Sequence, residues 1–287
     1  MKVIGIGDNV CDKYEHLSMM FPGGQALNFS VYAKMLGAES SYMGVFGDDP
    51  VAEHVIRTLD QLGVEHGRCR QYHGENGCAR VTLEKGDRVF LGSNRGGVAR
   101  EHPLELTEED LEYIKGFSLV HTSNNSYFER QLPRVWAAGV PISFDFSGRW
   151  TNKELVRQVA PCASWVFLSC GSLPEEEVRE ICREMKGAGC RRIVATRGSL
   201  GSVYYDGEDL IFQPPKLVEA VDTLGAGDSF ATAFLLSVTE AAGGDLEKLE
   251  EDRDAFRAQI VQAMEKGAEF AAKTCLVQGA FGHGTAF

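Results

Sequence analysis

Residues 41–62 read SYMGVFGDDPVAEHVIRTLDQL, an apolar run followed by a short polar turn and then an apolar pattern of a longer period. Residues 41–46 are typical of a buried strand. Residues 50–62 are typical of a helix, because apolar side chains recur every three or four positions from Val51 onward and Gly63 follows as a stop signal. This segment therefore predicts a strand followed directly by a helix.

A strand followed by a helix is also predicted in the sequence before residue 41. Residues 3–6 form a short apolar run that is typical of a strand, and a helical pattern opens after Gly23-Gly24 and closes at Gly37. A strand-helix-strand-helix order predicts an α/β protein with a parallel sheet covered by helices. Further strands are predicted at 119–122, 141–146, 165–169, 192–196, 203–205 and 210–212, and further helices at 107–115, 175–186, 228–240 and 256–275.

Residues 68–97 break this alternation. Two short β-type runs, 78–83 and 88–91, flank a turn-rich tetrapeptide at 84–87. A hairpin inserted into an α/β chain is expected either to lie over a site as a lid or to extend the edge of the sheet. Because no linker separates independent units, we expect one domain over residues 1–287, with lid segments at about 9–22 and 68–97.

The composition excludes several classes of function. The 287 residues include 29 Lys and Arg against 41 Asp and Glu, a net charge of −12, which disfavours non-specific binding to nucleic acid or to an anionic membrane surface. No apolar run approaches the ~20 residues of a membrane span, and the apolar stretch that ends at Asp8 is too short for a signal peptide. The eight cysteines form no Cys-x-x-Cys pair, so we expect reduced thiols and a cytoplasmic protein.

One segment combines small residues with an acid. Residues 222–228 read DTLGAGD and run directly into an apolar helical pattern. The backbone N–H groups of Gly225, Ala226 and Gly227 at the start of that helix are suited to bind an anion. Asp228 beside them would serve as a general base for an attacking hydroxyl, or it is simply a capping residue after a glycine turn.

This segment resembles the C-terminal signature of the PfkB/ribokinase family of carbohydrate kinases. A second match reads GGQALNFS from Gly23, and Gly37 and Gly47 follow at the family's spacing. The two signatures lie far apart and in the right order, so together they are more specific than either alone. The resemblance covers essentially the whole chain and is closest to the kinases that act on fructosamines such as fructoselysine. It implies a ribokinase-like three-layer sandwich, a mostly parallel central sheet flanked by helices, with a small β lid.

The resemblance also implies an activity. It implies ATP-dependent phosphoryl transfer to a primary hydroxyl of a sugar or sugar-amine adduct, with Mg²⁺ required. In that reaction Asp228 deprotonates the hydroxyl, and the amides of Gly225, Ala226 and Gly227 hold the transferring γ-phosphoryl group. Positioning and electrostatic stabilisation carry most of such a transfer.

Sugar-binding positions follow from the same resemblance. Hydroxyl recognition is expected from carboxylate, amide and backbone groups, at Asp8, Asn9, Asp12, Gly23, Gly24 and Asn28. Arg95, in the lid, is expected either to bind a carboxylate of the substrate beyond the sugar or to be a solvated surface charge. Asp8 and Asn9 have the alternative of forming a simple turn after the first strand.

Nucleotide-binding positions are predicted near the end of the chain. The loop formed by Thr196, Gly198 and Gly201 is similar to the family's nucleotide loop, although a plain turn has the same composition. Ala271 and Thr274 match positions that line the adenine pocket, with helix packing as the alternative.

Metal sites are less completely marked. Asp222 and the backbone near Gly279 resemble the family's monovalent-cation loop, which makes K⁺ a candidate activator. The family's Asn-x-x-Glu motif for Mg²⁺ is not intact, since residues 169–177 read SCGSLPEEE. Glu175 or Glu176 is then a substitute, or Mg²⁺ is held mainly by nucleotide phosphates and water.

Other functions remain open at this point. A kinase for a free ketose, a ribose-like sugar or a nucleoside has the same signatures, and so does a silent sugar-binding protein that kept the fold. A Rossmann-type oxidoreductase is disfavoured, because Val10 stands where its third glycine is needed. Exposed lid strands also predict a homodimer that pairs through the lid.

Overall fold

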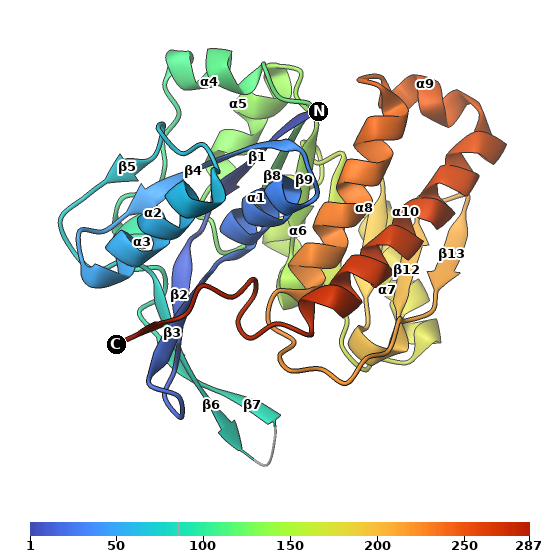
Figure 1. Cartoon of the computed structure of the whole chain (residues 1–287). Helices are drawn as coiled ribbons and strands as arrows, with labels where there is room; N and C mark the ends of the chain where they lie inside the picture. The colour runs from blue at the N-terminus through green and yellow to red at the C-terminus, as the bar shows by residue number, and fades with distance from the viewer. Residues whose placement is uncertain (85–86) are drawn as a thin grey trace.

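The computed structural model describes residues 1–84 and 87–287, so the predicted turn at 84–87 lies partly outside the described residues. A nine-stranded sheet forms the centre (Figure 1). Its strands, in spatial order, are β13 (Leu210–Gln213), β12 (Ser202–Tyr205), β11 (Ile193–Thr196), β10 (Trp165–Ser169), β9 (Ile142–Asp145), β8 (Leu119–Ser123), β1 (Lys2–Gly7), β4 (Glu39–Phe46) and β5 (Arg70–Gln71). The strands from β11 to β5 pair in parallel, and β12 pairs antiparallel with both of its neighbours, β11 and β13.

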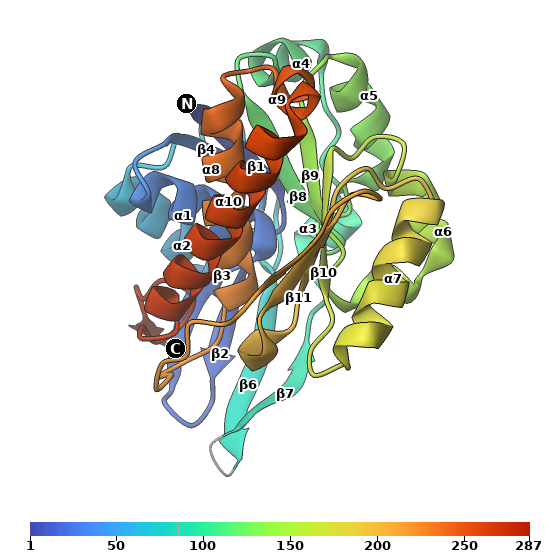
Figure 2. The same cartoon turned by 90° about the vertical axis from the view of Figure 1, so that its right-hand side faces the viewer.

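Helices cover both faces of this sheet, which makes three layers (Figure 2). One layer contains α1 (Gln25–Met35), α2 (Pro50–Leu62), α8 (Ala226–Ala242) and α10 (Arg253–Thr274), and the other contains α4 (Glu108–Ile114), α5 (Leu132–Ala137), α6 (Lys153–Val159) and α7 (Glu175–Gly187). Two short helices, α3 (Val98–Glu101) and α9 (Leu246–Glu251), lie in connections. The alternation of β1 shows why both faces are covered, because Val3 packs toward α8 and α10 while Ile4 and Ile6 pack on the opposite side.

The helix predicted at 50–62 is confirmed at both ends. The Asp49 carboxylate accepts a hydrogen bond from the Ala52 amide at 2.9 Å, and Pro50 occupies the first turn. Gly63 ends the helix in the left-handed conformation, with φ of 65°. None of the helices in the described residues is both long and apolar enough to cross a bilayer.

A second, five-stranded sheet lies below the first in Figure 1. We call it the lid sheet; its order is β14 (Thr285–Ala286), β3 (Met19–Gly23), β2 (Val10–Tyr14), β6 (Cys78–Glu84) and β7 (Asp87–Ser93). The hairpin predicted within 68–97 is confirmed as β6 and β7. The sequence pattern indicates only a polar stretch where β2 and β3 form, because Asp12 and Lys13 interrupt the apolar residues of β2 and Pro22-Gly23 end β3, and it gives no signal for β14.

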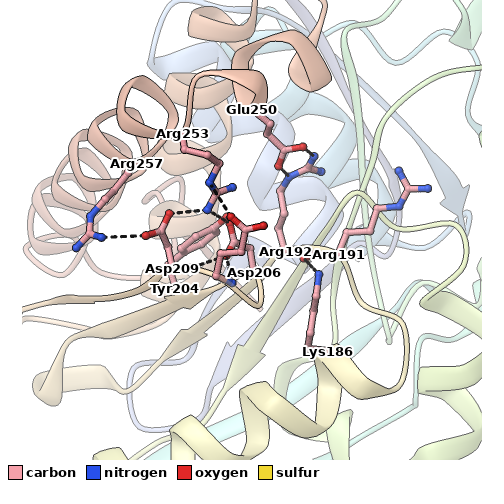
Figure 3. Close-up of polar contacts among 10 residues, drawn as sticks. Lys186, Arg191, Arg192, Tyr204, Asp206, Asp209, Glu250, Arg253 and Arg257 are labelled. Atoms are coloured by element: carbon pink, nitrogen blue, oxygen red, sulfur yellow. Dashed lines mark hydrogen bonds and ion pairs between the residues drawn. The ribbon is translucent and has the colours of Figure 1, made fainter.

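A charged cluster fastens α9 and α10 to the antiparallel end of the large sheet (Figure 3). The guanidinium of Arg192 binds both carboxylate oxygens of Glu250. Arg253 contacts Asp206 at 3.0 Å and Asp209 at 2.6 Å, and Arg257 contacts Asp209 at 3.0 Å. We call these six residues the charged cluster.

Candidate active site

Asp228 lies in the first turn of α8, where the sequence predicted a base. Its carboxylate accepts a hydrogen bond of 2.6 Å from the Asn28 side chain, which α1 supplies. Burial raises the pKa of Asp228 to about 6; the Asn28 hydrogen bond opposes this rise, and the negative charge of Asp8 adds to it. A carboxyl group with a pKa near 6 is ionised at neutral pH and is a stronger base than an ordinary aspartate.

The conformation of the loop that leads into α8 explains why it contains glycines. Gly225 has φ of 73°, and a Cβ atom there would lie 2.4 Å from the Tyr32 hydroxyl, so only glycine fits. Gly227, by contrast, faces open space, because a Cβ atom added there would have no neighbour within 4 Å. The Ala226 amide donates to the Thr223 carbonyl at 3.3 Å, whereas the described residues supply no acceptor for the Gly227 amide. The amides predicted to bind an anion are therefore not equivalent, because that of Ala226 is bound within the loop and that of Gly227 is open.

Three predicted sugar-binding residues lie together beside Asp228. Asn28 is buried, and its Oδ1 atom has no hydrogen-bond partner in the described part of the chain. A Cβ atom on Gly23 would lie 2.9 Å from Asp12 Oδ2 and 3.9 Å from Asn28 Oδ1. The lid strand β2 and helix α1 thus bring a carboxylate and an amide oxygen to the same place.

Asp8 and Gly24 shape the start of α1. The Asp8 carboxylate accepts hydrogen bonds from the Gln25 and Ala26 amides at 2.8 and 3.2 Å and from the Ser123 and Ser126 hydroxyls at 2.9 Å. Oδ1 accepts three of these hydrogen bonds and Oδ2 accepts one, so most of the acceptor capacity of this carboxylate is used within the protein. Gly24, with φ of 113°, allows the helix to begin close to β1, since a Cβ atom there would lie 2.8 Å from the Asp8 carbonyl oxygen.

Asn9 is likewise bound by the protein. Its amide donates to the Tyr42 hydroxyl and to the Val45 carbonyl, both at 2.9 Å, and its oxygen accepts from Asn76 at 2.8 Å. Asn9 therefore joins the end of β1 to β4 and to the segment that leads into the lid sheet. Together with Asp8, it holds the framework of the site, and direct contact of either residue with a sugar stays a prediction.

Asp145 is a buried carboxyl group that the sequence analysis did not single out as a site residue. It ends β9, and its side chain accepts a hydrogen bond of 2.6 Å from the Ser147 amide. Burial raises the pKa of Asp145 to about 7, and the charges of Asp228 and Asp8 add to the rise. The available signal was an acid at the carboxyl end of a buried parallel strand, where ligands bind in sheets of this kind.

Asp8, Asp145 and Asp228 together form what we call the carboxylate trio. Among the described residues, no lysine or arginine makes an ion pair with any of the three. The trio therefore gives this end of the sheet an uncompensated negative charge.

The predicted nucleotide loop follows β11. Gly198 has φ of 55° and open space around it, so it can approach a ligand closely. Gly201 instead packs against the strand beyond, since a Cβ atom there would lie 2.2 Å from the Gln213 carbonyl. Thr196 donates to the Leu168 carbonyl at 3.3 Å. Within this loop, Gly198 is thus the position that the structure leaves open.

The two residues predicted near adenine lie at the end of α10. Thr274 is buried and donates to the Phe270 carbonyl at 3.0 Å, and Ala271 packs against the apolar cluster between α8 and α10. Both contacts belong to the helix and its neighbours. Their role in binding adenine stays a prediction.

The predicted cation loop is organised by protein donors. Asp222 accepts from the Leu224 and Gly279 amides, both at 3.0 Å, and from the Tyr14 hydroxyl at 2.5 Å. A cation that used this carboxylate would share it with these donors, and K⁺ binding here stays a prediction.

The remaining predictions concern Mg²⁺ and Arg95, and both stay predictions. Glu175, the suggested Mg²⁺ substitute, is bound to Arg179 one helical turn away. No group of three or more His, Cys, Asp or Glu side chains within residues 1–84 and 87–287 has the geometry to hold a metal ion. Arg95 is exposed, and its backbone carbonyl accepts from the Tyr127 hydroxyl at 2.6 Å.

Comparison with known proteins assigns this site to a family. Residues 9–281 match the family described as pfkB family carbohydrate kinase. The chain belongs to this family. It is a sugar kinase, a phosphotransferase that acts on an alcohol group, as its signatures predicted.

Its relatives narrow the subfamily. The chain is 41% identical to fructosamine kinase FrlD of Bacillus subtilis over 99% of its own length and 94% of that protein. It is 31% identical to fructoselysine 6-kinase of Escherichia coli over 96% of its own length and 98% of that protein. The predicted likeness to kinases of fructosamines is thereby confirmed.

Solved structures confirm the fold class. The structure of Arabidopsis thaliana ribokinase complexed with ribose and ATP superposes with a TM-score of 0.78 at 19% identity, covering 98% of this chain and 94% of that one. Fructokinase from Xylella fastidiosa with bound ATP superposes with a TM-score of 0.76 at 17% identity, with the same coverage. The chain therefore has a ribokinase-like fold.

Proposed function

We propose that this sugar kinase transfers the γ-phosphoryl group of ATP to a primary hydroxyl of a fructosamine, of which fructoselysine is the first candidate. The observation that carries the proposal is the contact between Asn28 and Asp228 at 2.6 Å, next to the open amide face at Gly227. A base, a hydroxyl-binding amide and an anion-binding backbone are then adjacent. The relatives named for fructosamine and fructoselysine support the substrate class.

The transfer follows from this geometry. The substrate hydroxyl would lie within reach of the Asp228 carboxylate, which takes its proton as the oxygen attacks the γ-phosphorus. One oxygen–phosphorus bond forms, the bond to the β-phosphate bridge breaks, and ADP leaves. The Gly227 amide and the positive end of α8 stabilise the charge on the migrating group. Mg²⁺, when bound with the nucleotide, neutralises phosphate charge and is held mainly by phosphates and water.

The sugar would be held from two sides. Asp12 on the lid strand β2 and the unpartnered Oδ1 of Asn28 on α1 both accept hydrogen bonds from hydroxyl groups. Asp8 and Asn9 act indirectly, because their polar atoms already hold α1, β8 and β4 in place.

The charge of the site favours a fructosamine over a free sugar. A fructosamine carries a secondary amine that is protonated at neutral pH, whereas fructose and ribose are neutral. The carboxylate trio has no cationic partner among the described residues, so a cationic substrate relieves its mutual repulsion. A neutral ketose, a ribose-like sugar or a nucleoside would leave this charge uncompensated.

A substrate panel tests the proposal. ADP release is measured with ATP and Mg²⁺ on fructoselysine, fructose, ribose and nucleosides. We expect kcat/KM for fructoselysine to exceed that for free fructose by about 100-fold, the value of roughly 3 kcal/mol of added transition-state binding. Equal turnover of fructose would contradict the fructosamine assignment. No turnover of any sugar by folded protein would instead indicate a silent sugar-binding protein.

We also propose a homodimer that forms through β7. This strand is an edge of the lid sheet, and Phe90 and Leu91 on it are 64% and 48% exposed. Exposed edge strands with apolar side chains favour pairing with a second copy. Light scattering should give the mass of a dimer for the wild type and of a monomer for Leu91→Lys.

We also propose that the protein is located in the cytoplasm. The eight cysteines are all free thiols in the structure, as is usual for proteins of that compartment.

A further inference from the structure

Strand β2 contributes two inward-facing side chains to the site. Asp12 and Tyr14 are two residues apart and therefore point to the same face of the lid sheet. Asp12 lies beside Gly23 and Asn28, at the sugar end. Tyr14 is only 3% exposed, and its hydroxyl donates to Asp222 Oδ2 at 2.5 Å. One short strand thus contacts both the sugar end and the loop that leads into α8.

Asp222 in turn fixes that loop. Its Oδ1 accepts from the Leu224 amide and its Oδ2 from the Gly279 amide, both at 3.0 Å. Leu224 stands immediately before Gly225 and also packs on the apolar cluster of Tyr14, Phe21 and Val81. Polar and apolar contacts therefore both join the anion-binding loop to the lid sheet.

We propose that Tyr14 is a positioning residue for phosphoryl transfer, which holds the loop 222–227 in register with the strand that carries Asp12. This inference rests on the proposed function, since it assumes that the loop binds the migrating phosphoryl group. A loop with glycine at 225 and 227 has little rigidity of its own, so its geometry depends on external contacts. Small displacements of groups that stabilise a transition state are costly, because catalysis depends on their alignment.

Tyr14→Phe tests this role, because it removes only the hydroxyl and keeps the ring that packs on Phe21 at 5.1 Å. We expect kcat to fall about tenfold, the value of one hydrogen bond to a charged group, with KM for the sugar within about twofold. Tyr113→Phe is the matched control. Its hydroxyl also donates to a carboxylate, that of Glu65, at 2.5 Å, but between α4 and the end of α2. It should keep wild-type kcat.

A merely structural role would give different results. If Tyr14→Phe kept kcat within twofold of the wild type, or lost activity only through a raised KM for the sugar, the inference would be overturned. Melting temperatures of both variants show whether each is folded. All rates use the sugar that the wild type turns over fastest, so failure of the wild type on every sugar contradicts the proposed function instead.

A double-mutant cycle with Asp222→Ala tests the route. If Tyr14 acts through Asp222, the variant with both changes should have the kcat of Asp222→Ala alone, because alanine leaves no side-chain oxygen for the Tyr14 hydroxyl to hold. Losses that multiply in the double variant would show that Tyr14 acts independently of Asp222 and would overturn the proposal.

Discussion

Buried and half-buried acids are paired differently at the carboxyl ends and at the amino ends of the parallel strands of the large sheet. At the carboxyl ends of the parallel strands, the carboxylate trio has no arginine or lysine ion pair among the described residues. At the other end, where β11 begins, each carboxylate of the charged cluster is bound by a guanidinium (Figure 3). The acids of one end keep their mutual repulsion, and those of the other end hold helices in place.

Their pKa values differ accordingly. Burial raises the pKa of Asp145 to about 7 and that of Asp228 to about 6. Burial alone would also raise the pKa of Asp206, but the amides of Asp209 and Glu208 and the side chain of Arg253 lower it below the ordinary value. Raised carboxyl pKa values are characteristic of functional sites, whereas paired acids are characteristic of structural ones. Substitution of Asp228 in the carboxylate trio should therefore change mainly activity, whereas substitutions in the charged cluster should change mainly stability.

The largest expected effect is on activity. Asp228→Asn should lower kcat by about 10²–10⁴-fold, the usual contribution of a general base, and should leave the melting temperature unchanged or higher. Steady-state ADP release measures the first quantity and thermal denaturation the second. Wild-type turnover by Asp228→Asn would contradict the assignment of Asp228 as the general base.

The next effect is on stability, at the other end. Glu250→Gln leaves the buried Arg192 guanidinium without its carboxylate and should cost about 2–3 kcal/mol in the free energy of unfolding, slightly below the cost of breaking a fully buried pair. Urea denaturation measures it. Activity of the folded fraction should stay at the wild-type value, and a large loss of kcat here would mean that the charged cluster also serves catalysis.

A smaller effect concerns the pH dependence of stability. The pKa of Asp145 is raised in the folded protein, so its contribution to stability is fully present below about pH 4 and is lost as the pH rises through about 7. Asp145→Asn removes this loss and should stabilise the fold by about 1–3 kcal/mol at pH 8, part of the ~4 kcal/mol that three pKa units represent. Denaturation at pH 8 and pH 4 gives the comparison, and a variant that is less stable than the wild type at pH 8 would contradict it.

The smallest effect concerns the pH profile of activity, whose midpoint is expected above the ordinary pKa of a carboxyl group. Because Asp228 must be ionised to accept a proton, kcat/KM should be flat above about pH 6 and fall about tenfold per unit below it. Asp206→Asn, in the charged cluster, should leave this midpoint unchanged. Because Asp145 and Asp228 interact, the midpoint belongs to the pair, and a wild-type midpoint near pH 4 would show that Asp228 is not held as the structure indicates.

Features that depend on nearby residues alone could be predicted from the sequence. The helix at 50–62 and the strand at 165–169 have their predicted bounds, because periodicity and end signals lie within the segments themselves. The glycines and acid of residues 222–228 predicted a loop entering a helix for the same reason. Such features need no knowledge of distant residues.

What could not be predicted depends on pairing across long separations. Asp8 is bound by Ser123 and Ser126, more than a hundred positions away, so its sequence neighbours gave no sign that its carboxylate is already satisfied. Strand β2 carries Asp12 and Lys13 and so shows no apolar run, β14 has only two residues, and both strands pair with partners in the lid sheet. The contact between Tyr14 and Asp222 joins two segments that no local rule relates.

Strand β14 carries a consequence for how the molecule is made. Residues 285 and 286 pair with Met20 and Met19, so the lid sheet joins segments that lie more than 260 positions apart in the sequence. During translation β3 emerges early, and the edge that will pair with β14 stays unpaired while the central sheet forms. The lid sheet, and the sugar-facing strand within it, can therefore reach its final form only after residue 286 has left the exit tunnel.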